Sequence, residues 1–201
     1  MEPALLREIR RLERLTDELS LVTRAEAGVI PVELRAASLA ELVRVACAQF
    51  ERPFRNKGLT LDVNIQQDAR VLADPDRFTQ VLVNLLSNAL RHTSEGGVTV
   101  SAGTQGGVGQ VTVQDTGEGI AAHDLPHVFE RFYQSDTSRA RNTDEDIGTG
   151  IGLTVSRHLV EAMGGTLQAS SEVGKGTLLT VNLPLAGQSE ATAPLQEKQM
   201  I

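Results

Sequence analysis

The sequence predicts an α+β fold in which one mixed sheet carries helices on one of its faces. Three observations lead to this prediction. Alternating apolar residues mark several strands, apolar residues at helical spacing mark the segments between them, and a glycine-rich turn joins two neighbouring strands into a hairpin. Because strands, helices and hairpins are interleaved along the chain, we expect one sheet that contains both kinds of strand pairing.

Composition limits the kind of protein further. The chain has 201 residues, of which 40% are hydrophobic and 22% charged, and its net charge of −7 argues against a nucleic-acid surface. A single cysteine, Cys47, excludes an internal disulfide and a cysteine-based zinc site. No run of 18 apolar residues and no signal-peptide pattern occurs. We therefore expect a cytoplasmic chain with no membrane segment of its own, while a place within a longer membrane protein stays open.

The first 27 residues predict an amphipathic helix that ends before Gly28 and Pro31. Its seam is heptad-like, with spacings of four and three between Leu5, Ile9, Leu12, Thr16, Leu19 and Thr23. Such a helix cannot bury its apolar stripe alone. We expect a helical hairpin or bundle with another chain; the alternative is that the helix folds back on its own domain.

Patterning predicts the remaining elements in chain order. Helices are expected over 39–54, 74–93, 124–132 and 151–163, and Cys47 lies in the first as a small core residue. Strands are expected over 32–39, 59–65, 98–102, 108–114, 166–170 and 177–183. Residues 134–148 lack apolar periodicity and predict a mobile loop, and the tail from 186 to 201 predicts disorder.

The helix over 74–93 organises the rest. Asp74 can cap it and Pro75 can take its first turn, where a missing N–H costs nothing. Its apolar face consists of Phe78, Val81, Leu82, Leu85 and Ala89. A second face carries Asn84, Asn88 and Arg91. Amide oxygens suit Mg²⁺ and a guanidinium suits phosphate, although a solvated face with two incidental asparagines would look the same.

A first glycine motif, Asp115-Thr-Gly117-Glu-Gly119-Ile120, follows a predicted strand. Strand alternation places Asp115 at the end of an apolar row, where a carboxylate needs a hydrogen-bond donor. An adenine amino group would be such a donor, and the glycines permit a close backbone approach. The alternative is a plain Asx turn.

Two further glycine motifs follow. Gly148-Thr149-Gly150-Ile-Gly152-Leu153 opens a helix, whose free amides and dipole attract phosphate. It is not the dinucleotide fingerprint, because Leu153 stands where the last glycine belongs. The third motif, residues 174–177, is not a Walker loop because glycine follows its lysine.

In this order, the motifs resemble those of the nucleotide-binding domain of sensor histidine kinases, within the gyrase, Hsp90, histidine kinase and MutL superfamily. The resemblance runs from about residue 38 to 184, with an N box (84–93), an F box (129–132) and three glycine boxes (115–120, 148–153 and 174–177). It implies a two-layer α/β sandwich of the Bergerat type, with ATP and Mg²⁺ as the bound cofactors.

The resemblance also implies roles for matching positions. Asn88 looks like the Mg²⁺ ligand, with Asn84 beside it, while Arg91 would meet phosphate. Asp115 would read the adenine amino group with support from Thr177. The other positions implied in nucleotide binding are His92, Gly117, Gly119, Ile120, Tyr133, Gly148, Thr149, Gly150, Gly152 and Leu153. The sequence departs from the family pattern at two positions. Gln134 stands where the family often has arginine, and Ile147 stands where many relatives have glycine.

The same resemblance divides the chain into three parts. Residues 1–28 look like the second helix of the dimerisation and phosphoacceptor hairpin, residues 29–185 like the catalytic and ATP-binding domain, and 186–201 like a tail. The implied partners are a histidine-bearing dimerisation helix and a response regulator, with a homodimer in the full-length protein. The histidines are His92, His123, His127 and His158, and none has the phosphoacceptor context. We expect His92 to belong to the N box and His158 to lie on the surface. For His123 and His127 we expect an exposed short helix, and a metal-binding pair is the weaker alternative.

We expect phosphoryl transfer to a histidine absent from this chain, for relay to a response-regulator aspartate. ATPases of the superfamily place a glutamate four residues before the Mg²⁺ asparagine, and here that position is Asn84, which cannot act as a base. Two alternatives stay open: an ATPase of the same superfamily and a non-catalytic nucleotide-sensing module. A serine kinase that acts on an anti-sigma antagonist fits the leading helix less well.

Overall fold

The computed structural model describes residues 30–133 and 150–187, together with Ile9, Thr16, Ser20, Thr23 and Arg24. These five N-terminal residues are all helical, as the heptad-like spacing predicts. The packing of the predicted seam, the loop over 134–148 and the tail beyond residue 187 lie outside the described residues.

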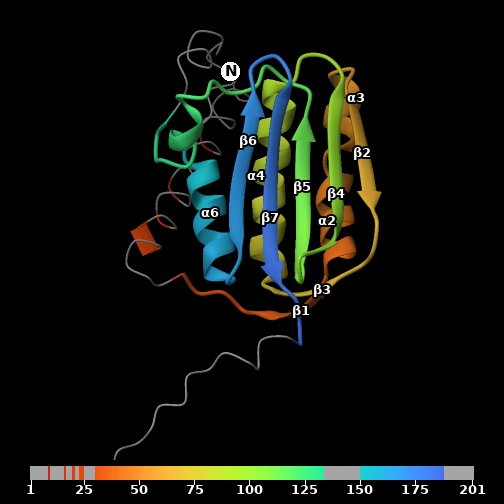
Figure 1. Ribbon diagram of the computed structural model, residues 1–201, viewed down its shortest axis with the longest axis vertical. Helices are drawn as coiled ribbons and strands as arrows, with labels where there is room; N and C mark the ends of the chain where they lie inside the picture. The colour runs from red at the N-terminus through yellow and green to blue at the C-terminus, as the bar shows by residue number, and fades with distance from the viewer. Residues whose placement is uncertain are drawn as a thin grey trace, which may run out of the picture.

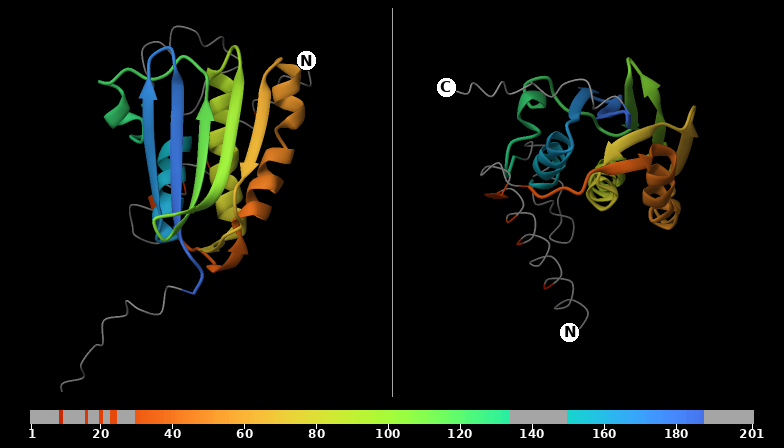
Figure 2. Two further views of the ribbon diagram at one scale, coloured as in Figure 1. Left: turned by 45° about the vertical axis from the view of Figure 1, so that its right-hand side comes forward. Right: turned by 90° about the horizontal axis from the view of Figure 1, so that it is seen from below.

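A five-stranded sheet forms one layer of the fold, and helices form the other (Figure 1). Its spatial order is β2 (Thr60–Ile65), β4 (Gly97–Gln105), β5 (Val108–Asp115), β7 (Gly176–Pro184) and β6 (Thr166–Glu172). β2 and β4 run parallel, and the other pairs are antiparallel. Figure 2 shows that α2 (Leu39–Ala48), α4 (Pro75–His92) and α6 (Gly152–Ala162) lie on the same face. The predicted α+β two-layer sandwich is therefore confirmed.

A small second sheet closes one end of the sandwich. β1 (Arg35–Ser38) pairs antiparallel with β3 (Arg70–Ala73), and a bridge joins Val71 to Leu185. The strand predicted over 32–39 is therefore shorter than expected, and β3 was not predicted. Four residues carry too little alternation to identify a strand, so β3 is defined by its distant pairing partners rather than by its own pattern.

The prediction of a single helix over 39–54 is wrong. This segment divides into α2, which Ser38 caps by accepting a hydrogen bond from the Glu41 amide at 3.1 Å, and α3 (Glu51–Asn56). Pro53 explains the break, because it has no N–H for the carbonyl of Gln49 and its ring would clash there. Cys47 is a core residue as predicted, and burial, with a smaller contribution from Glu51, raises its pKa to about 11.

The prediction of a short helix over 124–132 is also wrong, because this segment forms only one turn of 3-10 helix, η1 (Leu125–His127). The following backbone groups bond to the start of α6 instead. Thr154 Oγ donates to the Phe129 carbonyl at 2.8 Å, and the Phe132 amide donates to the Gly150 carbonyl at 2.9 Å. Phe132 accordingly has a φ of 60°, which an α-helix does not allow.

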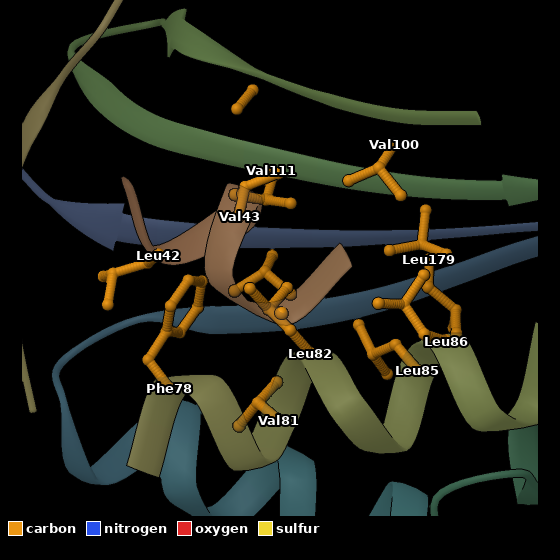
Figure 3. Close-up of a cluster of buried hydrophobic side chains, with 14 of the residues drawn as sticks. Leu42, Val43, Phe78, Val81, Leu82, Leu85, Leu86, Val100, Val111 and Leu179 are labelled. Atoms are coloured by element: carbon orange, nitrogen blue, oxygen red, sulfur yellow. The ribbon is translucent and has the colours of Figure 1, made fainter. Parts of the chain in front are cut away.

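The core fixes α4 against the sheet (Figure 3). The predicted apolar face of α4 is confirmed, because all five of its side chains are buried. They pack against side chains from α2 and the sheet, including Val43, Val100, Val111 and Leu179. Each buried large side chain contributes about 1.5–3 kcal/mol. No helix in the described part of the chain is both long and apolar enough to cross a membrane.

The start of α4 depends on a single buried carboxylate. Asp74 Oδ1 accepts hydrogen bonds from the amides of Asp76 and Arg77, both at 3.1 Å, as the predicted cap requires. Oδ2 accepts from the amide of Glu33 at 3.0 Å, which ties the incoming segment to the helix. Burial opposes ionisation of Asp74, but the three amides and the Arg77 charge outweigh it and hold its pKa below 3.8.

We expect Asp74→Asn to lower the free energy of unfolding by about 1–2 kcal/mol at neutral pH, because an amide NH₂ would face the Glu33 amide. The depressed folded-state pKa means that this stabilisation is present above the unfolded value of 3.8 and is lost as pH falls through the folded-state pKa. Urea unfolding of the wild type and of Asp74→Asn at a series of pH values from neutral to acid measures this difference. A difference between them that does not shrink in acid would contradict the assignment.

Candidate nucleotide-binding site

Asp115 lies at the end of β5, in the same inward-facing row as Val111 and Val113, and is 7% exposed. Its Oδ1 accepts hydrogen bonds from the amides of Gly117 at 2.8 Å and Thr177 at 3.1 Å. No described residue donates to Oδ2. The carboxylate is therefore held in place by one oxygen and keeps the other available as an acceptor.

The environment of Asp115 disfavours its charge. Burial raises its pKa above 3.8, and the hydrogen bonds from Gly117 and Thr177 together with nearby His92 only partly oppose this. Glu118 adds a smaller upward contribution. A buried carboxylate with an unsatisfied oxygen gains from a hydrogen-bond donor, and a base amino group would supply one.

The loop after Asp115 passes close to β6, and this is possible only with glycine at position 119. Gly119 has a φ of 72°, and a Cβ atom there would overlap the carbonyl oxygen of Glu172. The Gly174 amide donates to the Glu118 carbonyl at 2.8 Å on the same side. The first glycine box is thus held against the β6–β7 turn, as the close backbone approach predicted for it requires.

Asn84 joins α4 to the beginning of α6. Its Nδ2 donates to the Gly152 carbonyl and to Ser156 Oγ, both at 3.3 Å. The carbonyl partner needs a donor, so this contact assigns the amide orientation and leaves Oδ1 without a described partner. Amide oxygens are ligands that Mg²⁺ accepts, so Asn84 and Asn88, one turn further along α4, fit the predicted metal.

The end of α4 is held by two residues that sequence reasoning did not single out. Glu118 Oε1 lies 3.0 Å from His92 Nδ1, and its amide donates to the His92 carbonyl. Lys57 Nζ contacts the Leu90 carbonyl at 2.6 Å and the Arg91 carbonyl at 3.3 Å, where a cation complements the helix dipole. Lys57 precedes β2 by three residues, so only the fold brings it to Leu90 and Arg91.

Ser171 on β6 was also missed. Its Oγ contacts the Ile120 amide at 2.8 Å, the Gly176 carbonyl at 2.8 Å and Thr177 Oγ1 at 3.0 Å. The predicted support of Asp115 by Thr177 runs through the Thr177 backbone amide, while its side chain faces Ser171. The hairpin register, which pairs Ser171 with Thr177 across a short glycine turn, is the signal that could have found it.

The described glycines of the second box, Gly150 and Gly152, lie at the entrance to α6. Gly152 is the first residue of this helix, followed by Leu153, and the N-cap residue is Ile151, whose side chain cannot accept a hydrogen bond. The first-turn amides of α6 therefore suit an anion, and phosphate binding at this helix start stays a prediction. Gly148 and Thr149, together with Gln134 and Ile147, lie outside the described residues.

Tyr133, which directly follows the F box, and the three remaining histidines each have a described environment. The hydroxyl of Tyr133 donates to Asp124, so the structure places this predicted site residue against the η1 turn. His123 contacts Asp124 and His127 contacts Glu130, at 3.4 and 2.8 Å respectively. His158 is half-buried rather than a surface residue, and its Nδ1 is buried without a hydrogen-bond partner in the described part of the chain.

The fold and the site together define an ATPase-type nucleotide-binding domain. The family of histidine kinase-, DNA gyrase B- and HSP90-like ATPases matches residues 73–187, and the chain belongs to this family. The histidine-protein kinase BaeS of Escherichia coli K12 is 33% identical over 89% of the chain, and the sensor protein SrrB of Staphylococcus aureus MRSA252 is 34% identical over 89%. Full-length ShkA, solved with AMPPNP, superposes with a TM-score of 0.77 over 88% of the chain at 28% identity.

The matched region is one part of these larger proteins. The chain spans 38% of the length of BaeS, 30% of SrrB and 36% of the ShkA chain. The relationship therefore establishes the family of this domain, whereas the activity and partners of a whole kinase require separate arguments.

Proposed function

We propose that this chain is the ATP-binding catalytic part of a two-component sensor histidine kinase. It transfers the γ-phosphate of ATP to a histidine on another segment, from which a response-regulator aspartate takes it. The observation that carries the proposal is Asp115, a buried carboxylate anchored through Oδ1 with Oδ2 open to a base amino group. The anion-suited start of α6 and the amide face of α4 supply the complementary phosphate and metal chemistry.

Transfer is favoured over hydrolysis by the residue at position 84. Hydrolysis needs a base that orients water, whereas transfer relies on positioning and on neutralising phosphate charge. Asn84 carries no basic oxygen, and its amide nitrogen is engaged by Gly152 and Ser156. The acceptor is a neutral imidazole, which already carries a lone pair and needs no strong base.

Mg²⁺ would neutralise phosphate charge when bound beside the amide oxygens of Asn88 and Asn84. Arg91 would meet the same phosphates, and the amides at the start of α6 would add hydrogen bonds to them. Gly117, Gly119 and Ile120 would lie along the base, and His92 would line the pocket.

The predicted N-terminal helix is the basis for the proposed partners. Residues 1–28 would form the second helix of a dimerisation hairpin, so the complete protein would be a homodimer that presents the acceptor histidine to residues 29–185. Because ATP is the donor, this part of the protein would work in the cytoplasm, even if other parts cross a membrane.

The test mixes this chain with ATP, Mg²⁺ and the cognate hairpin fragment that carries the acceptor histidine. We expect acid-labile phosphate on the fragment, and Asn88→Ala should weaken nucleotide binding selectively when Mg²⁺ is present. Steady ATP turnover by the chain alone would favour the ATPase alternative. Tight ATP binding without any transfer would favour a nucleotide-sensing module.

A further inference from the structure

We propose that Ser171 is a positioning residue for base selectivity and that it acts by setting the direction of the Thr177 hydroxyl. This inference rests on the proposed nucleotide-binding function and deepens it. Ser171 lies on the inward side of β6, in the same row as Leu167 and Ala169, where a hydroxyl group is unexpected among apolar side chains unless it is fully hydrogen-bonded.

The three contacts of Ser171 Oγ determine where its single proton goes. The Gly176 carbonyl can only accept, so Ser171 donates to it at 2.8 Å. The Ile120 amide can only donate, so Ser171 accepts from it at 2.8 Å. The remaining neighbour, Thr177 Oγ1 at 3.0 Å, must therefore donate its own proton to Ser171.

The Thr177 hydroxyl is consequently restricted to accepting hydrogen bonds from anything else. The backbone amide of the same residue holds Asp115 Oδ1, and Asp115 Oδ2 is likewise an acceptor. The base site thus presents acceptors where adenine has an amino group. Guanine has a carbonyl oxygen at the equivalent ring position, which these acceptors would repel.

Ser171 also holds the base-facing loop in place. It shares this task with the hydrogen bond from the Gly174 amide to the Glu118 carbonyl at 2.8 Å, so the loop that carries Gly119 and Ile120 is attached to the β6–β7 hairpin at two points. Loss of the serine hydroxyl would free the Thr177 proton and leave the Ile120 amide without its acceptor.

The experiment measures dissociation constants of ATP, ADP and GTP with Mg²⁺ by calorimetry on the full chain. Ser171→Ala should weaken ATP and ADP by the same factor of about ten, since phosphates are not involved, and should lower the ratio of ATP to GTP affinity. Ser171→Thr should restore both quantities because it keeps the hydroxyl. Ser170→Ala, which removes the neighbouring exposed hydroxyl on the opposite side of β6, should leave them unchanged.

Wild-type ATP affinity or an unchanged ATP-to-GTP ratio in Ser171→Ala would overturn the proposal. Thr177→Val provides a second route if the alanine variant does not fold, because it removes the oriented hydroxyl at nearly constant shape. A lower ATP-to-GTP ratio in that variant supports the proposal, and an unchanged ratio contradicts it. Failure of the wild-type chain to bind any adenine nucleotide would instead refute the proposed function.

Discussion

Asp115→Asn is expected to lower ATP affinity by about tenfold or more without unfolding the protein. The asparagine oxygen can still accept the amides of Gly117 and Thr177 in place of Oδ1. Its NH₂ group then replaces Oδ2 and presents a donor to the donating amino group of adenine. Calorimetric titration with ATP checks the loss of affinity.

The stability of the same variant provides the internal control. Burial raises the folded-state pKa of Asp115 above its unfolded value of 3.8, so ionisation of this residue destabilises the fold. That penalty is absent below the unfolded pKa and is complete once pH has risen through the folded-state pKa. The difference in free energy of unfolding between Asp115→Asn and the wild type should therefore shift in favour of the variant between acid and neutral pH.

Asp62→Asn offers a matched comparison, because it makes the same change on an exposed residue of β2. It should leave ATP affinity as it is in the wild type. If Asp115→Asn also binds ATP like the wild type, Asp115 does not belong to the site.

Gly176→Ala is expected to lower the free energy of unfolding by about 3 kcal/mol or more and to reduce ATP binding. Gly176 has a φ of 100°, and a Cβ atom there would overlap the backbone carbonyl oxygen of Asp115. Relief of that overlap would move the neighbouring Thr177 amide away from Asp115 Oδ1. Chemical unfolding and ATP titration measure the two effects.

Gly174→Ala separates backbone strain from the overlap. Gly174 has a φ of 78°, but a Cβ atom there meets nothing within 4 Å. Its substitution should lower the free energy of unfolding by only about 1–2 kcal/mol. Equal losses in the two alanine variants would show that contact with Asp115 is unimportant.

Features governed by local periodicity were predictable from the sequence. The apolar spacing of α4 and the capping chemistry of Asp74 and Pro75 depend on residues a few positions apart, so the pattern contains the answer. The same holds for the inward row that ends at Asp115. Where a local signal was weaker, the prediction was less accurate: Pro53 divides the first helix, and hydrogen bonds to α6 replace the helix expected after Asp124.

The α+β class, the polar face of α4 and the buried carboxylate could be predicted from the sequence alone, because each depends on residues that are close together along the chain. Three features required the folded structure: β3 is a strand, Lys57 and Glu118 hold the end of α4, and Ser171 contacts the Thr177 hydroxyl. These contacts join segments separated by turns or by dozens of residues. Their geometry is set by sheet register and core packing, which no local pattern of side chains records.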